Sequence, residues 1–139
     1  NISVGRGTDR PFELLGAPWI DGRKLAEYLN ARRIQGVRFL PVEFTPRSDP
    51  FEGYECFGVS IVLLDRWALD AAELGVEIAA ALYHLFPREF AIDKTLALVG
   101  ARWVLDAIRA GEDPQSIALR WQAALQQFRR VRAKHLLYP

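Results

Sequence analysis

The residues of this chain that could most readily bind a ligand lie close to its start. Gly5, Arg6, Gly7 and Thr8 follow one another, so two glycines flank an arginine and a hydroxyl comes next. A planar guanidinium suits a carboxylate or phosphate, and glycines allow close approach of the backbone. The spacing fits neither a P-loop nor the dinucleotide-binding motif. It predicts either an anion-binding loop or a tight turn in which Arg6 pairs with a carboxylate such as Asp9.

A second group of candidates follows in the same segment. Glu13 lies among aromatic residues and prolines, where a carboxyl can be tuned to act as a general acid. Trp19 follows a proline, and an indole on a loop can stack on the face of a sugar. The alternative is structural: Trp19 packs in the core, and backbone amides or an arginine satisfy Glu13. The residues by themselves leave both interpretations open.

Further carboxylates lie around the predicted strands. Glycoside hydrolysis needs two carboxyls at a defined separation, which a sequence does not give. Asp65 is the best placed, because ligands of α/β proteins gather where strands end, but it could equally cap a turn. The set comprises Glu43, Asp49, Glu52, Glu55 and Asp65.

The remaining reactive residue types argue against metal and cofactor chemistry. His84 and His135 fall on separate predicted helices without metal-ligand spacing, so we expect no metal site and no cofactor. Cys56, the single cysteine, opens an apolar strand, where a thiol is usually inert. The net charge of +1 argues against nucleic-acid binding. Near the end of the last helix, where cations favour the helix dipole, lie Arg129, Arg130, Arg132 and Lys134.

The elements that position these residues follow from apolar patterns and caps. The chain has 139 residues, of which 50% are hydrophobic and 25% charged, enough for one core. Residues 1–20 are rich in Gly and Pro and predict an irregular segment with short extended stretches. Asp21 caps a helix over 22–33. Pro41 predicts that the strand over 37–44 is an edge strand or contains a bulge. The apolar run 56–65 predicts a strand buried on both faces.

The C-terminal half is predicted to be helical. Asp70 caps a helix that Pro87 stops, a short segment around 93–98 follows, and a helix over 101–110 ends at Gly111. Asp113 and Pro114 open the last helix, which carries apolar residues near one stripe. We therefore predict one α/β (or α+β) fold, a small, mainly β-sheet layer in the N-terminal half with helices packed on it, and three to four helices in the C-terminal half. No apolar run predicts a transmembrane segment.

Longer stretches of the sequence carry a family resemblance. The segments NISVGRGTDRPFELLGAPWID, GVRFLPVEFTP, GYECFGVSI and FRRVRAKHLLY occur in that order along almost the whole chain. Together they resemble the DUF1343 family, which includes the NamZ-type exo-β-N-acetylmuramidases of glycoside hydrolase family 171. The resemblance implies a peptidoglycan-degrading activity that removes N-acetylmuramic acid from the non-reducing end of glycan fragments.

The resemblance also implies a domain organisation. Family members are longer, and their active site is a cleft between a Rossmann-like N-terminal domain and a C-terminal domain. Residues 1–20 would lead in from the N-terminal domain, and 21–139 would form a single C-terminal domain on one side of the cleft. The catalytic glutamates would belong to the N-terminal domain, so we expect this chain to be inactive alone. The start at Asn1 and the absence of methionine fit a piece of a longer protein.

The resemblance assigns substrate-binding roles to the first loop. The lactyl ether of N-acetylmuramic acid carries a carboxylate, which Arg6 would bind through two hydrogen bonds. Gly5 and Gly7 would let the loop approach the sugar. Thr8 would bond a sugar hydroxyl or the acetamido group.

Three more residues complete the implied site, and two alternatives remain beside it. Glu13 would orient Arg6 or a sugar hydroxyl and is a weak catalytic candidate, while Trp19 and Tyr54 would form the cleft wall. The chain would then meet an N-terminal domain and a muramyl glycan in a periplasmic or extracellular parent protein. The alternatives are a non-catalytic muramyl-glycan binding module and an interaction domain that self-associates as a homo-oligomer.

Overall fold

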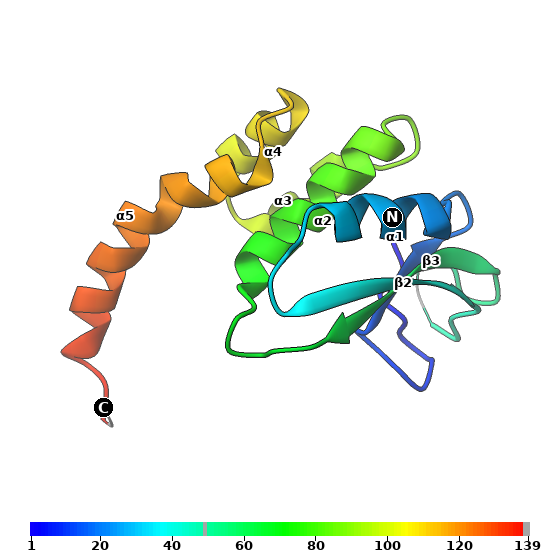
Figure 1. Cartoon of the computed structure of the whole chain (residues 1–139), viewed down its shortest axis with the longest axis horizontal. Helices are drawn as coiled ribbons and strands as arrows, with labels where there is room; N and C mark the ends of the chain where they lie inside the picture. Colours follow the sequence, from blue (N-terminus) through cyan, green and yellow to red (C-terminus); the bar gives the residue numbers. More distant parts are fainter. Residues whose placement is uncertain (49, 138–139) are drawn as a thin grey trace.

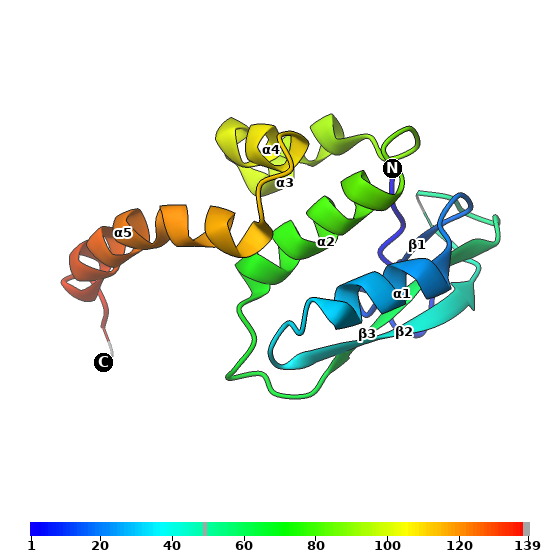
Figure 2. The same cartoon turned by 45° about the horizontal axis from the view of Figure 1, so that its top comes forward.

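The computed structural model describes residues 1–48 and 50–137 as a small sheet covered by helices. Figure 1 and Figure 2 show α1 lying over the sheet and α2 beside it, while α5 extends away from the body in both views. The predicted mixed α and β architecture is confirmed, and the described residues of the C-terminal half form four α-helices and one short 3₁₀ helix. The elements are β1 (Leu14–Ala17), α1 (Gly22–Ala31), β2 (Val37–Phe44), β3 (Cys56–Leu63), α2 (Ala71–Leu85), the 3₁₀ helix η1 (Ile92–Thr95), α3 (Leu96–Val99), α4 (Arg102–Arg109) and α5 (Pro114–Ala133).

The sheet has three antiparallel strands in the order β1-β3-β2. Pro41 pairs with Val59 in the ladder, and β2 is an edge strand, as the proline predicts. The central strand β3 is buried in its first half but not throughout, because Leu63 at its end is exposed. The expectation of a strand buried on both faces therefore holds only over its first five residues, 56–60, where every residue but Phe57 is buried.

Two glycines set how closely α1 approaches the sheet. A Cβ atom on Gly58 would lie 1.9 Å from the carbonyl oxygen of Leu15, and one on Gly22 would lie 2.4 Å from the carbonyl oxygen of Gly58. The first residue of α1 thus rests directly on the backbone of β3. Asp21 fixes that helix start, because its side chain accepts a hydrogen bond of 3.0 Å from the backbone N–H of Lys24.

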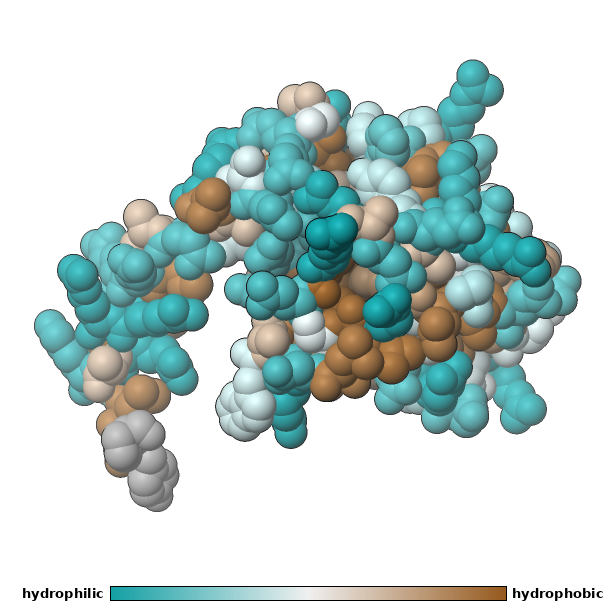
Figure 3. Space-filling view, in the orientation of Figure 1, coloured by the Kyte–Doolittle hydropathy of each residue, from teal (hydrophilic) through white to brown (hydrophobic). Residues whose placement is uncertain are grey.

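The hydrophobic core extends from the sheet through α1 to α2, α4 and the first turn of α5. α1 contacts β2 and β3, and α2 contacts α1, α4 and α5. Figure 3 shows that apolar side chains also remain on the surface over the part of the sheet where Figure 1 draws β2 and β3. The largest fully buried apolar side chains of the core are Phe39, Leu25, Leu29, Leu82, Leu105 and Ile117.

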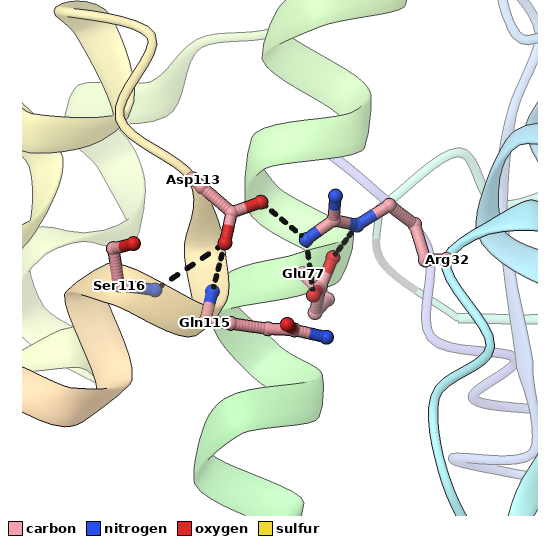
Figure 4. Close-up of polar contacts among 5 residues, drawn as sticks. All are labelled: Arg32, Glu77, Asp113, Gln115 and Ser116. Carbon is pink, nitrogen blue, oxygen red and sulfur yellow. Dashed lines mark hydrogen bonds and ion pairs between the residues drawn. The ribbon is translucent and has the colours of Figure 1, made fainter.

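A buried ion pair joins three of the helices (Figure 4). Glu77 of α2 is only 1% exposed, and it accepts two hydrogen bonds from Arg32, at 2.8 Å from Nε and 2.9 Å from Nη2. The same Nη2 donates to Asp113 at 2.7 Å, and Asp113 in turn caps α5 by accepting from the N–H groups of Gln115 and Ser116. Arg32 thereby connects the end of α1, the middle of α2 and the start of α5.

The charges in this cluster stabilise one another. The hydrogen bond with Glu77, and then that with Asp113, raise the pKa of Arg32. Burial by itself would raise the pKa of Asp113, but the hydrogen bond and charge of Arg32 outweigh it and hold that pKa below its usual value. Arg32 and Asp113 therefore stay charged at neutral pH. The cluster holds the helices through strong, directional bonds.

The helix caps predicted from the sequence are confirmed, but the last helix packs less than the others. Asp70 accepts from the N–H groups of Ala72 and Glu73 at 2.9 and 3.1 Å, and Gly111 follows α4 with a left-handed φ of 75°. In α5 only Pro114, Ile117 and Ala118 are buried. No helix in the described part of the chain is long and apolar enough to cross a membrane.

Replacing Glu77 by alanine tests the ion-pair cluster. The change leaves the Arg32 guanidinium without its main partner and opens a cavity beside it, so Glu77→Ala should lower the free energy of unfolding by about 3 kcal/mol. Urea unfolding followed by circular dichroism measures the loss. Glu73→Ala, one turn earlier on the same helix, is the control and should change stability by less than about 0.5 kcal/mol. Equal effects of both variants would contradict a stabilising role for the pair.

Candidate functional site

The N-terminal loop is held in a defined shape by its own backbone. The N–H of Phe12 donates to the carbonyl of Val4 at 2.7 Å and closes the loop. Buried Ser3 pairs with Gly16 through two backbone hydrogen bonds of 2.8 and 3.0 Å, which attach the loop to β1. The Gly-Arg-Gly-Thr motif therefore sits at the end of a closed loop beside the sheet.

Gly7 marks the place where this loop meets another segment. Its φ is 75°, and a Cβ there would lie 2.8 Å from the backbone N and C atoms of Arg47. The close approach expected from the glycines is thus present, but the partner is the chain's own backbone just after β2. The contact brings two segments far apart in the sequence together.

A groove of about 800 Å³ lies where the loop and the end of β2 meet. Its apolar floor comes from Leu14, Val42 and Phe44, which the strand register places on one face of the sheet. Polar side chains from the loop and from the residues after β2 surround this floor. The lining residues are Gly7, Thr8, Asp9, Arg10, Leu14, Val42, Glu43, Phe44, Thr45 and Arg47.

The polar lining could bind a ligand that carries both an acidic group and hydroxyls. Arg10 and Arg47 are exposed guanidinium groups that can form paired hydrogen bonds with a carboxylate. Asp9 and Glu43 can accept hydrogen bonds from hydroxyls, and Thr45 can donate or accept. Glycosidases keep a general acid protonated by burying it among apolar side chains. Asp9 and Glu43 are both exposed and have no such surroundings.

A second hollow of about 590 Å³ lies on the other side of the edge strand. Pro41 and Phe57 line it together with the start of α1, where Asp21 and Arg23 lie. It shares Val42 and Glu43 with the groove, so β2 forms the wall between the two. Arg23 gives this hollow a guanidinium of its own.

Arg6 lies beside the groove rather than in its lining. It is exposed, and its guanidinium carbon lies 5.6 Å from the ring centroid of Phe12. Phe12 is itself 66% exposed with a φ of 69°, a strained conformation for a residue with a side chain. Among the described residues Arg6 forms no ion pair, so the alternative of a turn held by an Arg6–Asp9 pair is not found.

The other residues of the loop serve its conformation. The Thr8 hydroxyl donates to the carbonyl of Gly5 at 2.6 Å and accepts from the N–H of Arg10 at 3.2 Å, which leaves it one free acceptor position. Glu13 has an exposed side chain, and its carbonyl accepts from the N–H of Ile61 at 2.7 Å. Nothing in the described contacts links Glu13 to Arg6, so its orienting role stays a prediction.

The two aromatic candidates lie apart from the groove. Trp19 is half-buried, packs on the core and meets Phe86 edge-to-face at 5.7 Å between ring centroids. Tyr54 is 65% exposed in the connection before β3. Neither lines the groove or the second hollow. Trp19 has the packing of a core residue, and the cleft-wall role of both residues stays a prediction.

Two of the remaining sequence candidates have structural explanations. Asp65 caps a turn by accepting from the N–H groups of Trp67 and Ala68 at 2.8 and 3.3 Å. Cys56 is buried, and burial raises the pKa of its thiol, which disfavours the reactive thiolate. Asp49 and the Tyr138 of the closing family motif lie outside the described residues. Within residues 1–48 and 50–137, no three potential metal ligands cluster.

Arg10, Thr45 and Arg47 are site residues that the sequence does not single out. They lie on two segments that only the folded chain brings together. Arg10 and Thr45 fall inside the segments that carry the family resemblance, but nothing in those segments distinguishes them as lining residues. The one usable signal is Gly7, whose need for close approach points to a crossing segment. The turn after β2 is that segment.

Comparisons with known proteins agree with the resemblance found in the sequence. A family model described as "Exo-beta-N-acetylmuramidase NamZ, C-terminal" matches residues 1–138. The peptidoglycan beta-N-acetylmuramidase NamZ of Bacillus subtilis (strain 168) is 36% identical over 141 aligned residues, which cover 99% of this chain and 34% of that protein. This chain therefore spans about a third of the length of that relative.

The fold also matches a solved structure. A DUF1343 family protein from Bacteroides fragilis NCTC 9343 superposes with a TM-score of 0.82 at 23% sequence identity. The match covers 99% of this chain and 38% of that one. The sheet, the covering helices and the last helix thus belong to a fold that occurs within a longer chain.

The contact between Gly7 and Arg47 can be tested with a pair of glycine variants. Gly53 also has a left-handed φ, of 77°, but nothing lies within 4 Å of a Cβ placed there. Gly53→Ala should therefore cost only conformational strain, about 1 kcal/mol, whereas Gly7→Ala should cost about 3 kcal/mol because backbone atoms block its Cβ. Urea unfolding of both variants measures the difference. Equal costs would mean that the loop does not press against the backbone of Arg47.

Proposed function

Because this chain belongs to the family of C-terminal domains of the exo-β-N-acetylmuramidase NamZ, we propose that it forms one wall of the glycan-binding cleft of a peptidoglycan-degrading hydrolase. The observation that carries the proposal is the groove between the Gly-Arg-Gly-Thr loop and the end of β2. The Bacillus subtilis relative, named as a peptidoglycan beta-N-acetylmuramidase, supports the substrate class.

The groove has the chemistry that N-acetylmuramic acid requires. That sugar carries a lactyl carboxylate beside ordinary hydroxyls and an acetamido group. Arg10 and Arg47 can bind the carboxylate, and Asp9 and Glu43 can accept from the hydroxyls. Arg6, exposed at the tip of the loop, is a third candidate for the carboxylate.

The residues of this chain fit substrate binding better than bond cleavage. A glycosidase needs a protonated general acid and a second carboxylate at a set separation. The groove's two carboxylates, Asp9 and Glu43, are both exposed to solvent. We therefore place the catalytic carboxyls outside this chain, in a Rossmann-like N-terminal domain of the parent protein. Since peptidoglycan lies beyond the cytoplasmic membrane, the parent would act in the periplasm or outside the cell.

The first test compares this chain with the full-length protein that contains it. The full-length protein should release N-acetylmuramic acid from muramyl disaccharides, and the 139-residue chain should release none. Chromatographic detection of the free sugar measures both. Turnover by the isolated chain would contradict the proposal that the catalytic carboxyls lie in another domain. Saturable binding of the glycan without turnover by the full-length protein would indicate a binding module instead.

A second test addresses the two groove arginines in the full-length enzyme. A charge-assisted hydrogen bond contributes about 1.5–3 kcal/mol, so Arg47→Ala and Arg10→Ala should each raise KM about tenfold or more. An analogue with N-acetylglucosamine in place of N-acetylmuramic acid lacks the lactyl carboxylate, and its kinetics should be nearly unchanged by either substitution. Arg88→Ala, an exposed arginine away from both hollows, is the control. A KM effect confined to Arg6→Ala would move carboxylate binding to the loop tip.

A further inference from the structure

Helix α5 leaves most of its length without a partner in this chain. Figure 1 and Figure 2 both show it running away from the body after its first turn. None of the described residues from 119 to 137 is buried. We refer to residues 119–133, the part of α5 beyond this first turn, as the arm.

The arm carries an apolar stripe that continues from the core. Trp121, Leu125 and Phe128 follow Ile117 at spacings of four and three residues, which places all four on one helix face. Ile117 is fully buried, Trp121 and Leu125 are half-buried, and Phe128 is 60% exposed. The same face thus passes from core to solvent along the helix. An isolated helix of this length is only marginally stable in water. An exposed apolar stripe on such a helix therefore indicates a binding surface for another part of a protein.

The base of the arm is firmly anchored, so its direction is part of the fold. Asp113 caps the helix and binds Arg32, as described above. Above the cap, the rings of Trp103 and Trp121 lie 6.4 Å apart. Arg120 stacks over Trp103 at 4.5 Å and donates to Glu112 at 2.8 Å. These contacts point the arm outward without using the exposed part of its stripe.

The charge of the arm defines the surface that can cover it. The arm, residues 119–133, contains four Arg and no Asp or Glu, a net charge of +4. Residues 1–113 contain 13 Lys and Arg against 17 Asp and Glu, a net charge of −4. Two arms side by side would therefore repel each other. A matching surface has an apolar groove for Phe128 bordered by carboxylates.

We propose that the arm is a docking helix whose Trp121–Leu125–Phe128 face is covered by an acidic, apolar-grooved surface of the remaining domain of the same protein. The relatives support this occupant, because they have about two further thirds of chain beyond the part that this chain matches. A covalently linked domain is also present at high effective concentration. The proposal rests on family membership and not on the enzymatic activity. The docking experiment and the activity experiment can therefore succeed or fail independently.

Hydrogen exchange in the full-length protein tests the docking. The backbone amides of residues 122–133 should exchange slowly in the natural protein, and Phe128→Asp should speed their exchange about tenfold or more. Gln126→Asp places the same charge on the opposite face and is the matched control. Because Phe128→Asp could also loosen the helix itself, a second pair of variants leaves the apolar residues of the stripe unchanged. Arg132→Glu, on the same face as Phe128, should speed exchange, and Arg130→Glu, on the opposite face, should not.

Three outcomes would overturn the proposal. Fast exchange of these amides in the natural protein would show that nothing covers the arm. Protection from exchange that appears only at concentrations where analytical ultracentrifugation detects a dimer would assign the arm to a second copy of the protein. Protection that appears only with phosphatidylglycerol vesicles, and not with phosphatidylcholine vesicles, would assign it to an anionic membrane.

Discussion

The pair formed by Glu77 and Arg32 is the constraint on which the arrangement of the helices depends. A carboxylate in the interior is costly unless it is both paired and hydrogen-bonded. Glu77 lies on the inner side of α2, so a guanidinium must reach it from a neighbouring element. Arg32, just past the end of α1, does so with two parallel bonds and retains a donor for Asp113. Apolar packing is largely non-directional, whereas these hydrogen bonds add fixed directions to the arrangement of the helices.

Much of the fold could be predicted from local chemistry. The caps Asp21, Asp70 and Asp113 predict three helix starts because a short acceptor beside an apolar periodic run satisfies the free N–H groups there. Pro41 predicts an edge strand because it lacks a donor. The ion-pair cluster could not be predicted, because nothing in the sequence shows that Glu77 faces the interior. The residues that flank Glu77 in the helical pattern do not distinguish a buried glutamate from an exposed one.

Some features of the candidate site could likewise be predicted from local sequence, while others depend on tertiary contacts. The Gly-Arg-Gly-Thr loop is recognisable as a special backbone element, and its glycines do have left-handed conformations. The purpose of Gly7, however, is set by Arg47, which lies in another part of the sequence. The groove forms where these two segments meet, so the sequence does not show that Arg10 and Arg47 line a common surface. A loop motif in a single sequence therefore predicts where a site lies better than which side chains line it.

The groove and the arm occupy opposite ends of the molecule, and the ion-pair cluster lies on the path between them. Figure 1 shows α5 leaving on the side opposite to the end of β2. A domain that docks on the arm is thus placed by a helix whose starting direction is set by Asp113 and Arg32, while Arg32 also holds α1 against α2. α1 in turn rests on β3 through Gly22 and Gly58, beside the strand that lines the groove. The chain of contacts from arm to groove is therefore made of short helices, one sheet and directional bonds. Such a frame can hold a docked domain in a fixed orientation toward the groove, which the proposed cleft between two domains would require.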